Sequence, residues 1–149
     1  MNNVVLDNTW RFFGLLLAQV LIFKQVSDAI GPWFSLFVYP LFVLFLPVLI
    51  PSSAAVLLAF LMGIIIDFYY QSPGVHASAS AFSAFCRSLI LAFLEPKGGF
   101  SGTAPIPTPH HVGWQTFIQI LTLYLFVHLF WYFAVSEFTF VYFGSILLK

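Results

Sequence analysis

Two charged side chains, Asp67 and Arg87, lie inside long apolar stretches and are the residues best placed to do chemistry. An ionisable group at membrane depth costs about 2.5–3.5 kcal/mol on insertion scales, so each needs a partner or a wet cavity. A mutual ion pair is one possibility. However, Arg87 lies ten residues beyond the start of its helix, roughly 15 Å along the axis, so this pair requires a tilted or broken helix.

His76 is the better partner for Asp67. Pro73 and Gly74 set a short turn between the two residues, which brings both side chains to the same end of their helices. We therefore predict a hydrogen bond between Asp67 and His76. A structural hinge is the expected role, and a ligand or proton site is the alternative.

For Arg87 we predict a structural charge. The expected partners are Ser83, one turn away on the same helix, and a group from another helix or a lipid phosphate.

The remaining histidines do not form a recognisable site. His110 and His111 are adjacent in a Pro-rich stretch and point in different directions, so a metal there would need outside ligands. His128 lies in the middle of an apolar run, which predicts a hydrogen bond to a neighbouring helix. No HExxH, GxSxG or Gly-rich phosphate loop is present in the sequence. We expect no catalytic residue, no cofactor and no metal.

Composition indicates a membrane protein. Of 149 residues, 61% are hydrophobic and 7% are charged, whereas a soluble domain has about 25% charged residues. The net charge of zero argues against nucleic-acid binding. A single cysteine, Cys86, excludes a disulfide within the chain and a cluster of thiolates. The apolar runs are continuous, so we expect an all-α integral membrane protein forming a single transmembrane domain.

The apolar runs predict five spans and a shorter sixth run. They cover residues 10–23, 33–50, 54–70, 77–94 and 114–135, followed by 138–148. A polar turn is expected at residues 25–32, and a long extended loop at 95–113.

Two of these runs are ambiguous. Residues 33–50 contain Pro40 and Pro47, which allow either one kinked span or an extended entry followed by a short helix. Residues 138–148 cover roughly half a bilayer, so they are either a re-entrant helix or a sixth span truncated at Lys149, which we favour.

The beginning and the orientation of the chain follow from its charges. Asp7 and Arg11 make the first run a retained span and not a cleaved signal peptide. With the N-terminus in the cytoplasm, Arg11, Lys97 and, if the last run crosses, Lys149 lie inside and only Lys24 lies outside, which favours this orientation.

Small residues predict where helices pack closely. Ala59 and Gly63 are four residues apart, a spacing that allows two helix backbones to approach. Along the fourth span a stripe of small residues predicts a buried face, formed by Ala77, Ala81, Ala84 and Ser88. An adjoining polar stripe contains Ser80, Ser83 and Arg87.

The stretch from Gly63 to Arg87 resembles the Bacteroidetes type of the MreD family of rod shape-determining proteins. The pattern is Gly-x-x-x-Asp at the end of a hydrophobic helix, a Pro-Gly-x-His-Ala turn, and a small-residue helix with an arginine. Its residues here are Gly63, Asp67, Pro73, Gly74, His76, Ala77 and Arg87. The resemblance extends over nearly the whole chain, but only this core is specific.

The resemblance implies a bundle of five to six transmembrane helices, similar to the substrate-binding components of energy-coupling-factor transporters. It implies a non-enzymatic scaffold in the bacterial inner membrane that regulates cell shape and peptidoglycan synthesis. MreC is the direct partner that it implies, with RodA, penicillin-binding protein 2 and MreB in the same elongation complex. The alternative is a small-solute binding component of such a transporter, which would require a polar pocket between helices.

Overall fold

The computed structural model describes residues 2–31, 36–95, 99–100 and 106–137. This part of the chain is helical, with no strand among the described residues. Four helical runs are long and apolar enough to cross a membrane, namely Val4–Ile30, Ser52–Tyr70, Val75–Phe93 and Trp114–Glu137. The predicted all-α, multi-pass membrane character is confirmed at this level.

The first run is longer than predicted. Helix α1 (Asn2–Leu17), the π-helix η1 (Ala18–Phe23) and α2 (Lys24–Ile30) follow one another without interruption. The turn expected at residues 25–32 is therefore wrong as far as Ile30. The reason is local, because Lys24 and Asp28 face each other one turn apart at 2.7 Å and support the helix that their charges seemed to end.

The next segment is a broken element inside the bundle. Helix α3 (Pro40–Leu44) has only five residues, and the chain on both sides of it is irregular. Proline starts this helix well but cannot continue one, which explains why it begins at Pro40 and ends before Pro47. Of the two shapes left open by the sequence, the extended entry with a short helix is the one observed.

Helices α4 (Ser52–Tyr70) and α5 (Val75–Phe93) form a tight hairpin. Its turn uses two left-handed residues, Gln71 and Gly74, with φ of 54° and 85°. After a loop come α6 (Pro109–Val112), a single turn within the loop expected at 95–113, and α7 (Trp114–Glu137). The predicted spans 54–70, 77–94 and 114–135 agree with α4, α5 and α7 to within two residues.

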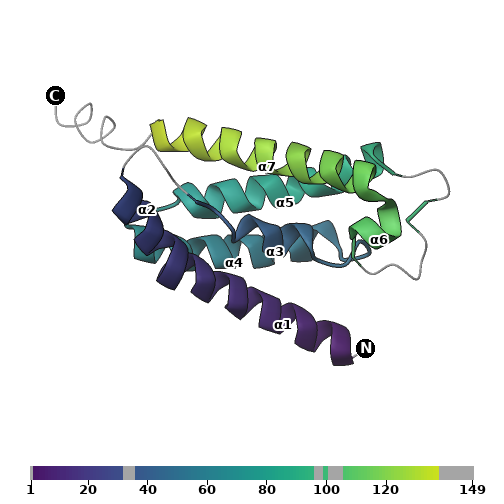
Figure 1. Ribbon diagram of the computed structural model, residues 1–149, viewed down its shortest axis with the longest axis horizontal. Helices are drawn as coiled ribbons and strands as arrows, with labels where there is room; N and C mark the ends of the chain where they lie inside the picture. Colours follow the sequence, from purple (N-terminus) through teal and green to yellow (C-terminus); the bar gives the residue numbers. More distant parts are fainter. Residues whose placement is uncertain (1, 32–35, 96–98, 101–105, 138–149) are drawn as a thin grey trace.

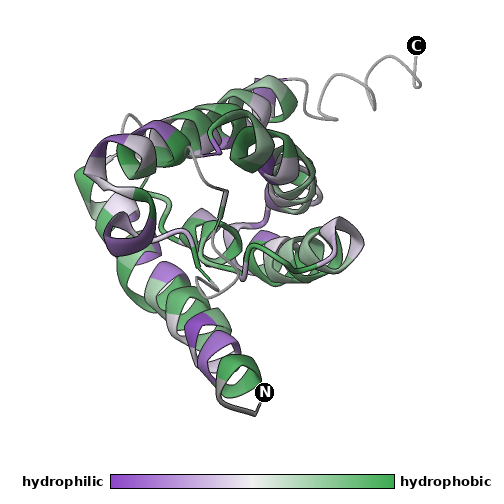
Figure 2. Cartoon of the chain, turned by 90° about the vertical axis from the view of Figure 1, so that its right-hand side faces the viewer, coloured by the Kyte–Doolittle hydropathy of each residue, from purple (hydrophilic) through white to green (hydrophobic). Residues whose placement is uncertain are grey.

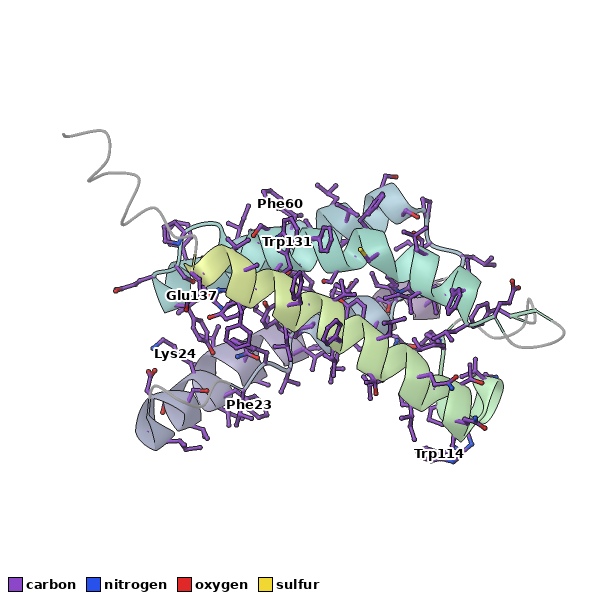
Figure 3. All side chains as sticks on the ribbon, turned by 90° about the horizontal axis from the view of Figure 1, so that it is seen from above. Phe23, Lys24, Phe60, Trp114, Trp131 and Glu137 are labelled. Atoms are coloured by element: carbon purple, nitrogen blue, oxygen red, sulfur yellow. The ribbon has the colours of Figure 1, made fainter. Side chains whose placement is uncertain are left out.

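Helix α5 is the centre of the bundle, since it packs against both α4 and α7 (Figure 1). The first helical run lies beside α3 and diverges from the rest toward its N-terminus (Figures 1 and 2). Figure 3 shows Lys24 and Glu137 at one end of the bundle and Trp114 at the other. Large apolar side chains are exposed along the helices, among them Phe68 (84%) and Phe93 (83%), as expected for surfaces covered by lipid.

The buried face of α5 differs in part from the predicted one. Ala77 and Ala84 are buried, but Ala81 is only half-buried and Ser88 is exposed. The face is rotated toward the polar stripe, where His76, Ser80, Ser83 and Arg87 are all buried. Polar groups gain nothing from facing lipid, so hydrogen bonding and not residue size decides which side of α5 faces inward.

Gly63 and Ala77 mark the closest approach of α4 and α5. A Cβ atom on Gly63 would lie 2.5 Å from the Ala77 Cα. This distance is too short, and a backbone atom cannot move aside as a flexible side chain can. Ala59, one turn earlier, is also completely buried. The close packing predicted from Ala59 and Gly63 is therefore confirmed. The expected sixth run, residues 138–148, lies outside the described residues.

We predict that Gly63→Ala destabilises the folded protein by about 1–3 kcal/mol, because the new methyl group forces the α4 and α5 backbones apart. The measurement is thermal unfolding of the purified protein in detergent. Gly14→Ala is the matched control, since nothing lies within 4 Å of that position and alanine is the better helix former. Equal melting temperatures for the two variants would contradict the close contact.

Candidate functional site

Asp67 lies in the last turn of α4 and caps the start of α5. Its Oδ1 accepts hydrogen bonds from the His76 N–H (2.9 Å) and the Ser72 hydroxyl (3.1 Å). Its Oδ2 accepts from the N–H groups of Gly74 (3.1 Å) and Ala77 (3.0 Å). Helix N-termini have unpaired N–H groups and a positive dipole end, so a carboxylate there is doubly stabilising. The cap comes from the preceding helix and fixes the hairpin angle.

The predicted bond between Asp67 and His76 is confirmed. Asp67 Oδ1 lies 2.9 Å from His76 Nδ1, and the Ser72 hydroxyl is also 2.9 Å from that nitrogen. The His76 ring is fully buried among aromatic rings, those of Phe37, Tyr39, Tyr70 and Tyr132. Its Nε2 has no hydrogen-bond partner among the described residues, so the ring is held from one side only.

A second buried network joins three elements through His128. Its Nε2 lies 2.9 Å from the Tyr39 hydroxyl before α3, and its Nδ1 lies 3.0 Å from the Ser83 hydroxyl of α5. Ser83 also reaches the Tyr124 hydroxyl of α7 at 3.4 Å. The prediction that His128 bonds to a neighbouring helix is confirmed, and the network ties α7 to the rest of the core.

Gln19 supports the beginning of the broken segment. Its Nε2 donates to the Leu36 carbonyl (2.9 Å) and lies 2.7 Å from the Tyr70 hydroxyl. Its Oε1 accepts from the N–H groups of Val38 (2.7 Å) and Tyr39 (3.3 Å). One fully buried side chain thus satisfies three backbone groups that no helix pairs. It lies in η1, and a π-helical turn changes the direction in which a side chain projects.

Arg87 supports the other end of the same segment. Its Nη2 donates to the carbonyls of Leu44 (3.5 Å), Leu46 and Pro47 (3.4 Å). The Leu44 and Leu46 carbonyls lie where α3 ends and Pro47 prevents its continuation, so they need donors from elsewhere. The Pro47 carbonyl also accepts from the Ile50 N–H (3.2 Å). The expectation that Ser83 satisfies Arg87 is wrong, because Ser83 bonds to Ser80, Tyr124 and His128. The ion pair with Asp67 does not form either, since that carboxylate caps α5.

The buried polar side chains described above mainly stabilise the fold. Ser83 beside His128 has the residue types of a nucleophile and base, but both side chains are completely buried. Ser83 also donates toward the Ser80 carbonyl at 3.1 Å, which occupies its proton. Among the described residues, no group of three or more His, Cys, Asp or Glu side chains could hold a metal ion. His110 and His111 lie exposed on α6.

Sequence reasoning predicted a hydrogen bond for His128 but not its partners, and it gave Gln19 no role. Tyr39 and Tyr124 were not recognised at all, although both are fully buried with bonded hydroxyls. The available signal was Pro40 with Pro47, since a broken helix inside an apolar chain requires polar side chains to pair its backbone.

No family model, curated protein or solved structure matches the chain.

We predict that Asp67→Asn destabilises the protein more than any exposed Asp→Asn change. The amide keeps one acceptor oxygen and loses the charge, and a hydrogen bond to a charged group contributes about 1.5–3 kcal/mol. The measurement is the melting temperature in detergent. Asp28→Asn is the matched control, because its surface pair with Lys24 contributes about 0–1 kcal/mol. A smaller effect at Asp67 than at Asp28 would contradict the capping role.

We also predict that Gln19→Leu lowers the yield of folded, monodisperse protein. Each buried backbone group left without a partner costs about 1–3 kcal/mol, and three such groups depend on Gln19. Gln119→Leu, on the exposed side of α7, makes the same chemical change and is expected to leave the yield unchanged. The measurement is size-exclusion chromatography after extraction, and indistinguishable profiles for the two variants would refute the role of Gln19.

Proposed function

We propose that this chain is a non-enzymatic membrane scaffold of the MreD type, acting in the bacterial elongation complex that controls cell shape and peptidoglycan synthesis. The observation that supports this proposal best is the use of the buried polar side chains. Asp67, Gln19, Arg87 and His128 all hold backbone or neighbouring helices in place. A fold whose buried polar side chains make structural hydrogen bonds is suited to presenting a fixed surface to other proteins.

The family pattern agrees with the hairpin residue by residue. Gly63 allows the close approach to Ala77, Asp67 caps α5, Gly74 takes the left-handed turn and His76 bonds to Asp67. These five positions of the pattern therefore have a physical role in one structural unit. That agreement supports the resemblance, which rests on residues scattered over two helices and a turn.

The finer features of the fold belong to the same proposal. Residues 36–51 run from the level of Gln19 to the level of Arg87, so they act as a second crossing made by a broken element. With the four long runs this gives five crossings, in a bundle similar to the substrate-binding components of energy-coupling-factor transporters. We place the protein in the inner membrane with its N-terminus in the cytoplasm, from the distribution of basic residues.

The proposed direct partner is MreC, and RodA, penicillin-binding protein 2 and MreB join through the same complex. The contact surface would be apolar, because partners within a membrane meet side chains like those that lipid covers. Exposed positions on different faces are available to locate it, among them Trp10, Phe68 and Phe93.

The test is co-expression of the chain with MreC from the same genome, with a photo-crosslinking residue at single positions. We expect a crosslink to MreC from one or more of Trp10, Phe68 and Phe93, and none from the fully buried Ile120. Arg87→Ala is expected to reduce co-purified MreC, because it releases the end of α3 and disturbs the bundle.

The transporter alternative predicts different results. A solute-binding component would purify with a stoichiometric small molecule, and neither crosslinks nor co-purification with MreC would be seen. That pair of observations would refute the scaffold proposal.

A further inference from the structure

Arg87 has binding capacity that the protein does not use. Its side chain is 4% exposed, and all of its hydrogen bonds among the described residues come from Nη2. Nε is buried without a partner, and Nη1 makes no hydrogen bond in the described part of the chain. A buried guanidinium with unused donors and no carboxylate bound to it is an uncompensated charge, which is costly within an apolar bundle.

Arg87 lines a cavity of about 220 Å³ at one end of the bundle. Polar side chains reach this cavity from three places, namely Ser52 at the start of α4, Ser88 on α5 and Glu95 just after α5. The other walls are apolar, with Ile50, Leu91 and Phe100 among them. Ser52, Ser88 and Glu95 are exposed, so the cavity opens to the surroundings of the protein.

The position of the cavity is that of a lipid headgroup. Helix α4 begins and helix α5 ends there, so it lies where membrane-spanning helices reach the interface. The first turn of α4 directs its N–H groups and positive dipole end to this level, and Pro51 before it provides no side-chain cap. An anion in the cavity would therefore meet Arg87, the Ser52 hydroxyl and a helix N-terminus.

Glu95 makes the site selective. A carboxylate on the wall disfavours a second negative charge but would pair with an ammonium group. We propose that this cavity binds the headgroup of a zwitterionic, amine-bearing phospholipid. Its phosphodiester lies against Arg87 and the start of α4, and its ammonium group lies against Glu95. The apolar walls accommodate the glycerol and upper acyl chain, which the exposed rim leaves connected to the bilayer.

The test is native mass spectrometry of the purified full chain with defined lipids. Phosphatidylethanolamine is titrated against phosphatidylglycerol with the same acyl chains, because the two differ in the ammonium group. We expect one phosphatidylethanolamine bound in preference to phosphatidylglycerol. Glu95→Gln should reduce that preference by up to about fivefold, the range expected for an exposed ion pair. Glu95→Lys should reverse the preference.

Controls separate the site from general lipid adhesion. Glu137→Gln makes the same charge change at the opposite end of α7 from Trp114, and should leave the preference intact (Figure 3). Arg87→Lys should weaken binding of both lipids, since a lysine keeps the charge but lacks the paired donors. Equal binding of both lipids by the wild type, or a preference unaffected by Glu95→Gln, would overturn the proposal. Inorganic phosphate that displaces the lipid at equal concentration would also overturn it, because the site would then be for a free anion.

Discussion

The structure depends on one constraint, which is that backbone polar groups inside an apolar bundle must find partners within the protein. A continuous helix usually meets this constraint, but within residues 36–51 the helix extends only from Pro40 to Leu44. Two buried side chains provide what the missing helix would have supplied. Gln19 pairs the backbone at the beginning of the segment and Arg87 pairs carbonyls at its end. The positions of the first helical run and of α5 follow from these bonds.

The hairpin of α4 and α5 provides the frame on which that segment rests. Asp67 closes the hairpin at the turn. Gly63, one helical turn before Asp67 in α4, lets the two helix backbones approach closely. Because the cap is a carboxylate from the neighbouring helix, the turn cannot open without exposing both a charge and several N–H groups. The cap and the close contact therefore hold α4 and α5 at a fixed angle, as the proposed scaffold role requires.

Arg87 has both a structural role and a role in the proposed lipid site. Its Nη2 is committed to the carbonyls at the end of α3, and Arg87 also lines a cavity shared with Glu95. A structural charge and a lipid site are therefore two uses of one guanidinium. Burying a guanidinium in an apolar bundle is costly, and a bound phosphate would offset part of that cost.

The sequence by itself determined the membrane class, three of the long helices to within two residues, and the bond between Asp67 and His76. Continuous apolar runs, a Pro-Gly turn and a short separation between two polar residues are local signals, and local geometry decides them. Tertiary structure alone decided that residues 25–30 are helical, that α3 is short, and that Arg87 bonds to carbonyls instead of Ser83. It also rotated α5, so that Ser88 faces outward and the polar stripe faces inward. These outcomes depend on which distant backbone groups lack hydrogen-bond partners. The residues next to a side chain in the sequence do not show which groups those are.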